Sequence, residues 1–260
     1  MSSRREQKEQ AKAKRQAAEA EQAASEQRKR KLLYSVGGAV LLAAIVVVVL
    51  VAVNSGGNDG DGGNGLQGVS ETNALFSDVP QRGETLGNPN AKVEMLDFSD
   101  MQCPFCAEYT VKVLPTIVDR YVRTGRMKIT HHLLTFIGPQ SLDAAKYAIA
   151  AGLQNKSWNY TNLFYHNQGP EGSGYANKEF LTNIGDNIPG LDVAKVQSQL
   201  NAGPVTKDIG DSQQLASSLG VDSTPSFFIK KNGGQPQRLE VESLTPEEFT
   251  KQIDAAIGES

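Results

Sequence analysis

The feature that most limits how this chain can fold is an uninterrupted apolar run near its N-terminus. Residues 32–53, LLYSVGGAVLLAAIVVVVLVAV, include no charged side chain in 22 positions. About 20 apolar residues in a helix cross the roughly 30 Å hydrocarbon layer of a membrane. No turn signal divides the run into two buried strands, and it is longer than the apolar part of a usual signal peptide. We therefore predict a single transmembrane helix that is retained as a signal-anchor.

The composition differs on the two sides of this run. Residues 1–31 carry ten Lys or Arg against five Glu and cannot form an apolar core. Basic residues flank only the N-terminal end, which predicts a single-pass protein of the cell membrane with a cytoplasmic tail and an extracytoplasmic remainder. Residues 54–68 contain seven glycines and predict a flexible linker. From residue 32 onward, 16 basic and 24 acidic side chains give a formal charge of −8, which argues against nucleic acid as a partner.

The remaining segment, residues 69–260, is long enough for one apolar core and has an α/β pattern. Residues 91–98 alternate and then become apolar, as a strand entering a buried sheet does, and residues 126–136 have the same character. Between them, apolar residues recur at helical spacing, and Pro115 should kink that helix. The pattern predicts a βαβ unit with parallel strands.

Helical patterns separated by Gly and Pro follow over about 139–220, which predicts a helical insert. Residues 225–231 and 238–244 flank a Gly-rich loop and predict a β-hairpin. Thr245, followed by proline and by glutamate three positions later, predicts the start of a final helix.

The chain has two cysteines, Cys103 and Cys106, in the stretch CPFC. A zinc site needs further ligands, and the chain offers only His131, His132 and His166 besides its acids, so no metal site is expected. A structural disulfide that closes so short a loop would restrict the unfolded chain little. The two histidines on the predicted second strand, His131 and His132, should lie one in the core and one exposed.

A reactive pair is the interpretation that the spacing favours. Two thiols at positions i and i+3 at the start of a helix can form a small disulfide ring, and Pro104 suits the first helical position. If Cys103 is the N-cap residue, the helix N–H groups and dipole stabilise its thiolate. Cys106 lies one turn inside the helix, so we expect Cys103 to be the attacking sulfur and Cys106 the resolving one.

The segment VEMLDFSDMQCPFC, together with GVDSTPSFFI about 120 residues later, resembles the DsbA-like thiol:disulfide oxidoreductases of the thioredoxin superfamily over residues 84–257. The resemblance implies a thioredoxin fold with a helical insertion. It also implies that Pro225 is a cis-proline and that the Thr224 backbone pairs with the substrate chain. Asp97 occupies the place of a buried acid that accepts a proton from Cys106, although an ordinary aspartate at the surface end of a strand is the alternative.

Several residues at or near the pair bear on how strongly it oxidises. Phe105 stands where those proteins have histidine, and with Pro104 it should tune the site, as should Asp100. A threonine before the cis-proline is more typical of the disulfide isomerases of the superfamily.

The sequence therefore predicts a membrane-anchored thiol:disulfide oxidoreductase that forms disulfides in exported proteins and needs no bound cofactor. The resemblance implies that a quinone-linked membrane protein reoxidises the pair. Two alternatives stay open: an isomerase or reductase supplied by a membrane electron donor, and a thioredoxin-like module that binds partners without turnover.

Overall fold

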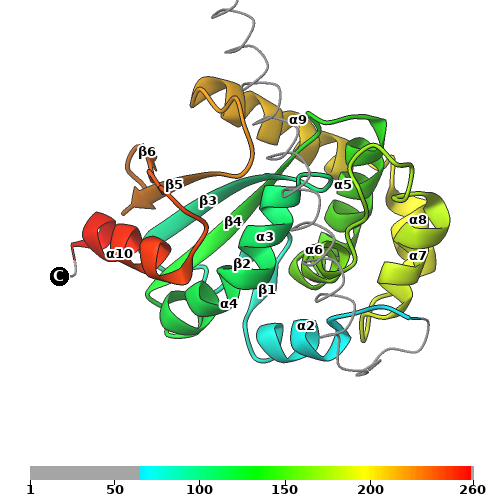
Figure 1. Ribbon diagram of the computed structural model, residues 1–260, viewed down its shortest axis with the longest axis horizontal. Helices are drawn as coiled ribbons and strands as arrows, with labels where there is room; N and C mark the ends of the chain where they lie inside the picture. The colour runs from blue at the N-terminus through cyan, green and yellow to red at the C-terminus, as the bar shows by residue number, and fades with distance from the viewer. Residues whose placement is uncertain (1–64, 259–260) are drawn as a thin grey trace, which may run out of the picture. The chain divides into compact units, whose positions relative to one another are not determined.

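The computed structural model describes residues 65–258, which contain one mixed β-sheet with helices on both faces (Figure 1). Strands β3 and β4 pair in parallel at its centre, as the βαβ pattern predicted, and β5 pairs antiparallel with β3. The six strands follow the order β1-β2-β4-β3-β5-β6. Their bounds are Gln81–Arg82, Thr85–Leu86, Val93–Asp100, Met127–Leu134, Ser226–Lys231 and Gln237–Arg238 for β1 to β6.

The edges of the sheet differ from the prediction. The hairpin β1–β2, preceded by helix α2 (Val69–Phe76), was not predicted, because strands of two residues give no alternating pattern. The predicted strand 238–244 is wrong in extent, since β6 pairs with β5 only through Gln237 and Arg238.

The helix after the cysteines is interrupted near Pro115, as predicted. Helix α3 (Pro104–Lys112) is followed by the short α4 (Leu114–Ile117) and by a π-helical turn, η1 (Val118–Val122). Proline has no N–H to donate and its ring clashes with the carbonyl of the preceding turn, so it kinks or breaks an α-helix.

Helices occupy the predicted insert and the C-terminal end of the described chain. The C-terminal helix α10 (Pro246–Ile257) begins after Thr245, whose hydroxyl oxygen accepts a hydrogen bond from the N–H of Glu248, as predicted. The insert contains α5 (Pro139–Gly152), α6 (Ser157–His166), α7 (Lys178–Asp186), α8 (Val193–Gln199) and α9 (Gly203–Ser218).

The two faces of the sheet bury different clusters. Because side chains alternate along a strand, Met95 packs toward α3, α4 and α10, whereas Leu96 and Phe98 pack toward α9. Figure 1 shows α9 on one side of the sheet and α4 and α10 on the other. A third cluster, built mainly from the insert, contains Cys103 and Cys106. The insert therefore encloses the cysteine pair.

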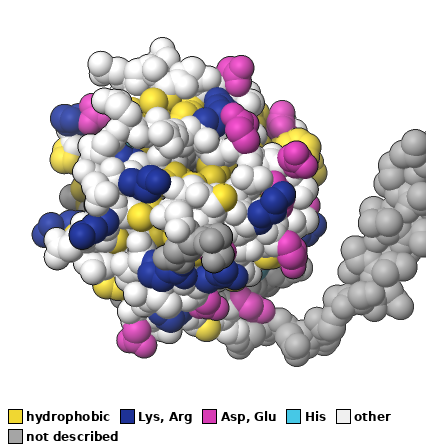
Figure 2. Space-filling view, turned by 90° about the vertical axis from the view of Figure 1, so that its left-hand side faces the viewer, with side chains coloured by type: hydrophobic (Ala, Val, Ile, Leu, Met, Phe, Trp, Pro, Cys, Tyr) yellow, Lys and Arg dark blue, Asp and Glu magenta, His cyan; other side chains and the backbone are white. Residues whose placement is uncertain are grey.

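The predicted membrane helix, the basic tail and residues 54–64 of the linker lie outside the described residues. Within residues 65–258, no helix combines the length and the apolar character needed to cross a membrane. On the face drawn in Figure 2, basic and acidic side chains are interspersed, with small apolar areas between them.

Candidate active site

The end of β3 and the start of α3 position the cysteine pair. Cys103 is the N-cap of α3, with extended backbone angles (φ −73°, ψ 120°), and Pro104 is the first helical residue, as predicted. The Cys103 N–H donates to the Asp100 carbonyl at 2.9 Å, and the Cys103 carbonyl accepts from the N–H of Ala107 at 3.2 Å. This arrangement directs free N–H groups of the first turn toward the Cys103 sulfur.

Both sulfurs lie largely inside the protein. Cys106 is fully buried and Cys103 is only 4% exposed, whereas Phe105 between them is 59% exposed. Phe105 therefore presents an apolar ring at the surface beside the buried pair.

The two thiols have opposite acid strengths. The pKa of Cys103 falls to about 6, mainly because the Cys106 thiol donates a hydrogen bond to it. The Thr224 side chain and the N–H groups of Cys106 and Phe105 lower the pKa further, whereas burial raises it. Burial first, and then the neighbouring Cys103, raise the pKa of Cys106 well above its ordinary value. At neutral pH, Cys103 is a thiolate and Cys106 a thiol. These are the protonation states expected of an attacking and a resolving sulfur.

The loop before β5 faces Cys103. The peptide bond between Thr224 and Pro225 is cis, the geometry that the resemblance implied. Cys103 Sγ lies 3.3 Å from the Thr224 carbonyl oxygen, to which the thiol donates when it is protonated, across 121 positions of sequence. Because Ser226 pairs with Phe98 at the start of β5, the sheet itself carries this loop to the end of β3, where the cysteines lie.

Asp97 is a buried carboxyl group on β3. It is 1% exposed, so the alternative of a surface aspartate at the end of a strand is wrong. The Ser99 hydroxyl donates to Asp97 Oδ1 at 2.6 Å. Burial raises the pKa of Asp97 to about 7, against the lowering effect of the Ser99 hydrogen bond, and the charge of Asp97 contributes to the raised pKa of Cys106. A group that titrates near neutral pH beside a buried thiol is suited to exchange protons with it.

Asp100, which the sequence suggested as a tuning residue, joins two loops at the site. Its Oδ2 accepts from the N–H groups of Phe136 at 2.8 Å and Ile137 at 3.1 Å, and its Oδ1 accepts from the Gln102 N–H at 2.9 Å. Asp100 is fully buried, and it fixes the loop after β4 against the loop that leads to Cys103.

Two residues of the insert make contacts that the sequence did not reveal. Gln168 donates through Nε2 to the carbonyl oxygens of Met101 at 2.9 Å and Cys103 at 3.2 Å. The Tyr165 hydroxyl donates to the Asp100 carbonyl at 3.0 Å. No local pattern marks either residue, because each acts on a segment about 65 positions away. Residues at the end of α6 and just after it thus hold the loop that carries Cys103.

One of the two histidines agrees with the prediction and the other differs from it. His131 is buried beneath α6, where it stacks on Trp158 with ring centroids 4.9 Å apart. His132 is not exposed, because it stacks on Phe98 and its Nδ1 lies 3.2 Å from the Ser212 hydroxyl on α9. Among residues 65–258, no three His, Cys, Asp or Glu side chains cluster as a metal site would require.

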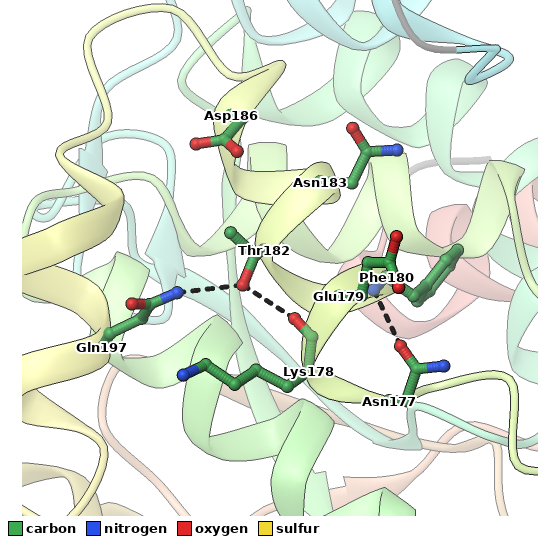
Figure 3. Close-up of a pocket in the computed structure, with 8 residues that line it drawn as sticks. All are labelled: Asn177, Lys178, Glu179, Phe180, Thr182, Asn183, Asp186 and Gln197. Carbon is green, nitrogen blue, oxygen red and sulfur yellow. Dashed lines mark hydrogen bonds between the residues drawn. The ribbon is translucent and has the colours of Figure 1, made fainter.

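A pocket of about 980 Å³ lies away from the cysteines, in the insert (Figure 3). Thr182 of α7 accepts a hydrogen bond from Gln197 of α8 at 2.9 Å across it. Its lining consists of Asn177, Lys178, Glu179, Phe180, Thr182, Asn183, Asp186 and Gln197. None of the predicted site residues lines it, so it is not part of the cysteine site.

Comparison with known proteins places the chain in a family. The thioredoxin family profile matches residues 81–255, about two thirds of the sequence, and the chain belongs to this family. It is 26% identical over 182 residues to a probable disulfide bond formation protein D of Bacillus anthracis, covering 69% of this chain and 83% of that protein. It is 29% identical over 195 residues to a putative protein-disulfide oxidoreductase of Rickettsia prowazekii, covering 74% and 67%.

Solved structures agree on the fold. The oxidised BdbD of Bacillus subtilis superposes with a TM-score of 0.59 at 15% identity, covering 69% of this chain and 97% of that one. The paired cysteines and the named relatives define the chain as a thiol:disulfide oxidoreductase.

Proposed function

We propose that this enzyme forms disulfides in exported proteins through the Cys103–Cys106 pair. The observation that carries the proposal is the pairing of a Cys103 thiolate at the start of α3 with a buried Cys106 thiol. A thiolate of low pKa is a good leaving group, so a disulfide that contains Cys103 is readily transferred to a substrate. The relative from Bacillus anthracis, named as a probable disulfide bond formation protein, supports this direction.

The reaction consists of two exchanges in this proposal. A substrate thiolate attacks Cys103 Sγ of the oxidised pair, the Cys103–Cys106 bond breaks, and Cys106 leaves and takes up a proton. A second substrate thiolate then attacks the substrate sulfur of the mixed disulfide and releases Cys103 as a thiolate. The substrate loses two electrons, and the enzyme pair gains them.

The neighbouring residues have distinct roles in this scheme. Asp97 supplies the proton to the leaving Cys106 and takes it back when the pair is reoxidised. The backbone of Thr224, before Pro225, offers its edge to an extended substrate segment as an added strand. Pro104 fixes the first turn of α3, and the exposed ring of Phe105 gives a substrate an apolar contact beside the sulfur.

The proposed location and partners follow from the N-terminal sequence. Residues 32–53 would anchor the enzyme in the cell membrane, with residues 1–31 in the cytoplasm and the linker 54–68 leading to an extracytoplasmic catalytic domain at 69–260. A quinone-linked membrane protein would restore the disulfide after each turnover. The oxidising conditions outside the cytoplasm are those in which protein disulfides persist.

The test is oxidative refolding of reduced ribonuclease by the full chain. We expect Cys103→Ser to abolish the reaction, whereas Val111→Ser, an exposed change on the same helix, leaves it intact. Unchanged turnover by Cys103→Ser would contradict the mechanism. Turnover by the unsubstituted enzyme would also exclude a module that only binds partners.

The reductase alternative runs the same exchanges in reverse, whereas an isomerase breaks and re-forms substrate disulfides with no net transfer of electrons. Both are favoured by Phe105, because the residue between the cysteines provides no positive charge for the thiolate. Equilibration with glutathione buffers separates oxidase from reductase, since a reduction potential near about −120 mV indicates an oxidase and one near about −270 mV a reductase.

A further inference from the structure

The buried imidazole of His131 is a polar group that the mechanism above does not use. His131 is 2% exposed, and neither of its ring nitrogens has a hydrogen-bond partner within the described residues. Its ring is held firmly. The Glu84 carbonyl oxygen accepts both from the backbone N–H of His131 at 3.0 Å and from Trp158 Nε1 at 2.9 Å, and the Trp158 ring stacks on the imidazole. A buried polar group without a hydrogen-bond partner destabilises the folded state, so its presence calls for an explanation.

Asp97 is the acid that His131 faces. The two residues are direct neighbours in the register of the parallel strands β3 and β4. His131 Nε2 lies 3.8 Å from Asp97 Oδ2, while the other carboxyl oxygen, Oδ1, accepts a hydrogen bond from the Ser99 hydroxyl. This separation exceeds a hydrogen bond, but a shift of less than about 1 Å would close it. The sheet pairing thus keeps the imidazole within reach of one free oxygen of the acid.

The contact is between an acid and a neutral imidazole. Burial lowers the pKa of His131 to about 3, with a smaller effect from His132, so the ring is uncharged at neutral pH. A neutral imidazole with its proton on Nε2 can donate one hydrogen bond to a carboxylate. It stabilises the carboxylate without forming an ion pair.

Other titratable groups also surround this acid. The charge of Asp97 raises the pKa of three neighbours, Cys106 and Tyr109 on α3 and Tyr165 on α6. The Tyr165 hydroxyl already donates to the Asp100 carbonyl. The Tyr109 hydroxyl has no hydrogen-bond partner within residues 65–258, which makes it the rival donor.

Further titratable side chains lie on the strand of His131 or on the segments that pack beside it. His132 follows on the same strand and points to α9, where Ser212 lies beside its ring. The Glu84 side chain interacts with Asp208 of α9.

We infer that His131 is a positioning residue for Asp97: its Nε2–H closes onto Asp97 Oδ2 when the acid loses its proton, and so favours the carboxylate that receives the proton of Cys106. The inference rests on the proposed function only in taking Asp97 as the proton acceptor. In the step itself, the Cys106 S–H bond breaks and an O–H bond forms on Asp97, with no transfer of electrons to or from His131. The imidazole keeps its own proton throughout.

The direct test is the titration of the Asp97 carboxyl group by carbon NMR in the full chain labelled at aspartate Cγ. The signal of Asp97 is the one that Asp97→Asn removes. His131→Phe retains a ring that can stack on Trp158 but removes the donor, and we expect it to raise the titration midpoint of Asp97 by about one unit. His131→Gln restores an N–H donor and should return the midpoint toward that of the unsubstituted chain.

Two matched controls make the result specific. His132→Phe changes the neighbouring ring on the other face of the strand and should leave the Asp97 midpoint in place. Tyr109→Phe removes the rival donor and should also leave it in place. An unchanged midpoint in His131→Phe, or a rise only in Tyr109→Phe, overturns the inference.

A second measurement needs no substitution, in case His131→Phe does not fold. The nitrogen NMR signal of His131 Nε2 in the unsubstituted chain should shift as pH passes the midpoint of Asp97, and a constant signal overturns the inference. These titrations do not depend on turnover. A failure of the proposed function would appear as absent ribonuclease oxidation, and a failure of this inference as an unresponsive Asp97 midpoint.

Discussion

Replacing Asp97 with asparagine should make the protein more stable, and increasingly so as pH rises. Asparagine keeps the carbonyl oxygen that accepts from Ser99 Oγ but cannot ionise. In the unsubstituted protein, burial raises the pKa of Asp97 from 3.8 to about 7. The folded state therefore holds this proton more tightly than the unfolded state does. Its contribution to stability is fully present below pH 3.8 and is lost progressively as pH rises to about 7.

The magnitude follows from the difference between the two pKa values. The shift of Asp97 is about three units, and each unit corresponds to about 1.36 kcal/mol, so the complete loss is about 4 kcal/mol. About one third of this loss has occurred by about pH 5, and nearly all of it by about pH 8. Between these two pH values, the stability of the unsubstituted protein should fall by about 2 to 3 kcal/mol more than that of Asp97→Asn.

Urea unfolding of both full-length proteins at the two pH values measures this difference. Other titrating groups are shared by the two proteins, and their effects cancel in the comparison. Asp222→Asn, at an exposed position, is the matched control and should follow the unsubstituted protein. Parallel pH profiles for Asp97→Asn and the unsubstituted chain would refute the assignment of Asp97 as a destabilised, buried acid.

Three further predictions follow from the same structure. The pKa of Cys103 is lowered to about 6, so the rate at which iodoacetamide alkylates the reduced chain should rise with pH, with a midpoint near pH 6. A midpoint near the ordinary thiol value of 9.0 would contradict this prediction. Asp100→Ala removes the acceptor of the Phe136 and Ile137 N–H groups and should lower the free energy of unfolding by about 2 kcal/mol in urea titrations. Equal stability would show that water replaces the carboxylate. Burial and the neighbouring acid Asp208 raise the pKa of Glu84 from 4.5 to about 8, so the folded state loses stability as pH rises over that range. Glu84→Gln should therefore become more stable relative to the unsubstituted protein from about pH 5 to about pH 8. A difference in melting temperature between the two proteins that stays constant over this range would contradict it.

The sequence was most informative where the interactions are local. The alternating and apolar residues of β3 and β4 predicted their parallel pairing, because a strand that is followed by a helix and another strand has few ways to pack. The position of Cys103 at the start of α3 followed from Pro104 and the helical spacing after it. The placement of Asp97 and Thr224 needed the family resemblance, since nothing in their immediate neighbourhood reveals it.

The sequence was least informative where residues distant in the chain meet. Gln168 holds the carbonyl of Cys103 from a loop of the insert, and no periodicity indicates that contact. His132 was expected to be exposed, because strand alternation gives two faces but does not say that α9 covers the second one. The unpaired imidazole of His131 beside Asp97 likewise emerges only from the strand register.

The central claim is that Cys103 is the attacking sulfur and Cys106 the resolving one. Trapping of mixed disulfides by the full chain tests it most directly, with insulin as the disulfide partner. In Cys106→Ser, the Cys103 thiolate can attack an insulin disulfide but nothing resolves the product, so a covalent adduct should accumulate on a non-reducing gel and vanish with reductant. Cys103→Ser should form no such adduct at neutral pH, because its remaining thiol is buried and protonated. An adduct that forms through Cys106 in Cys103→Ser, and not through Cys103 in Cys106→Ser, would contradict the account.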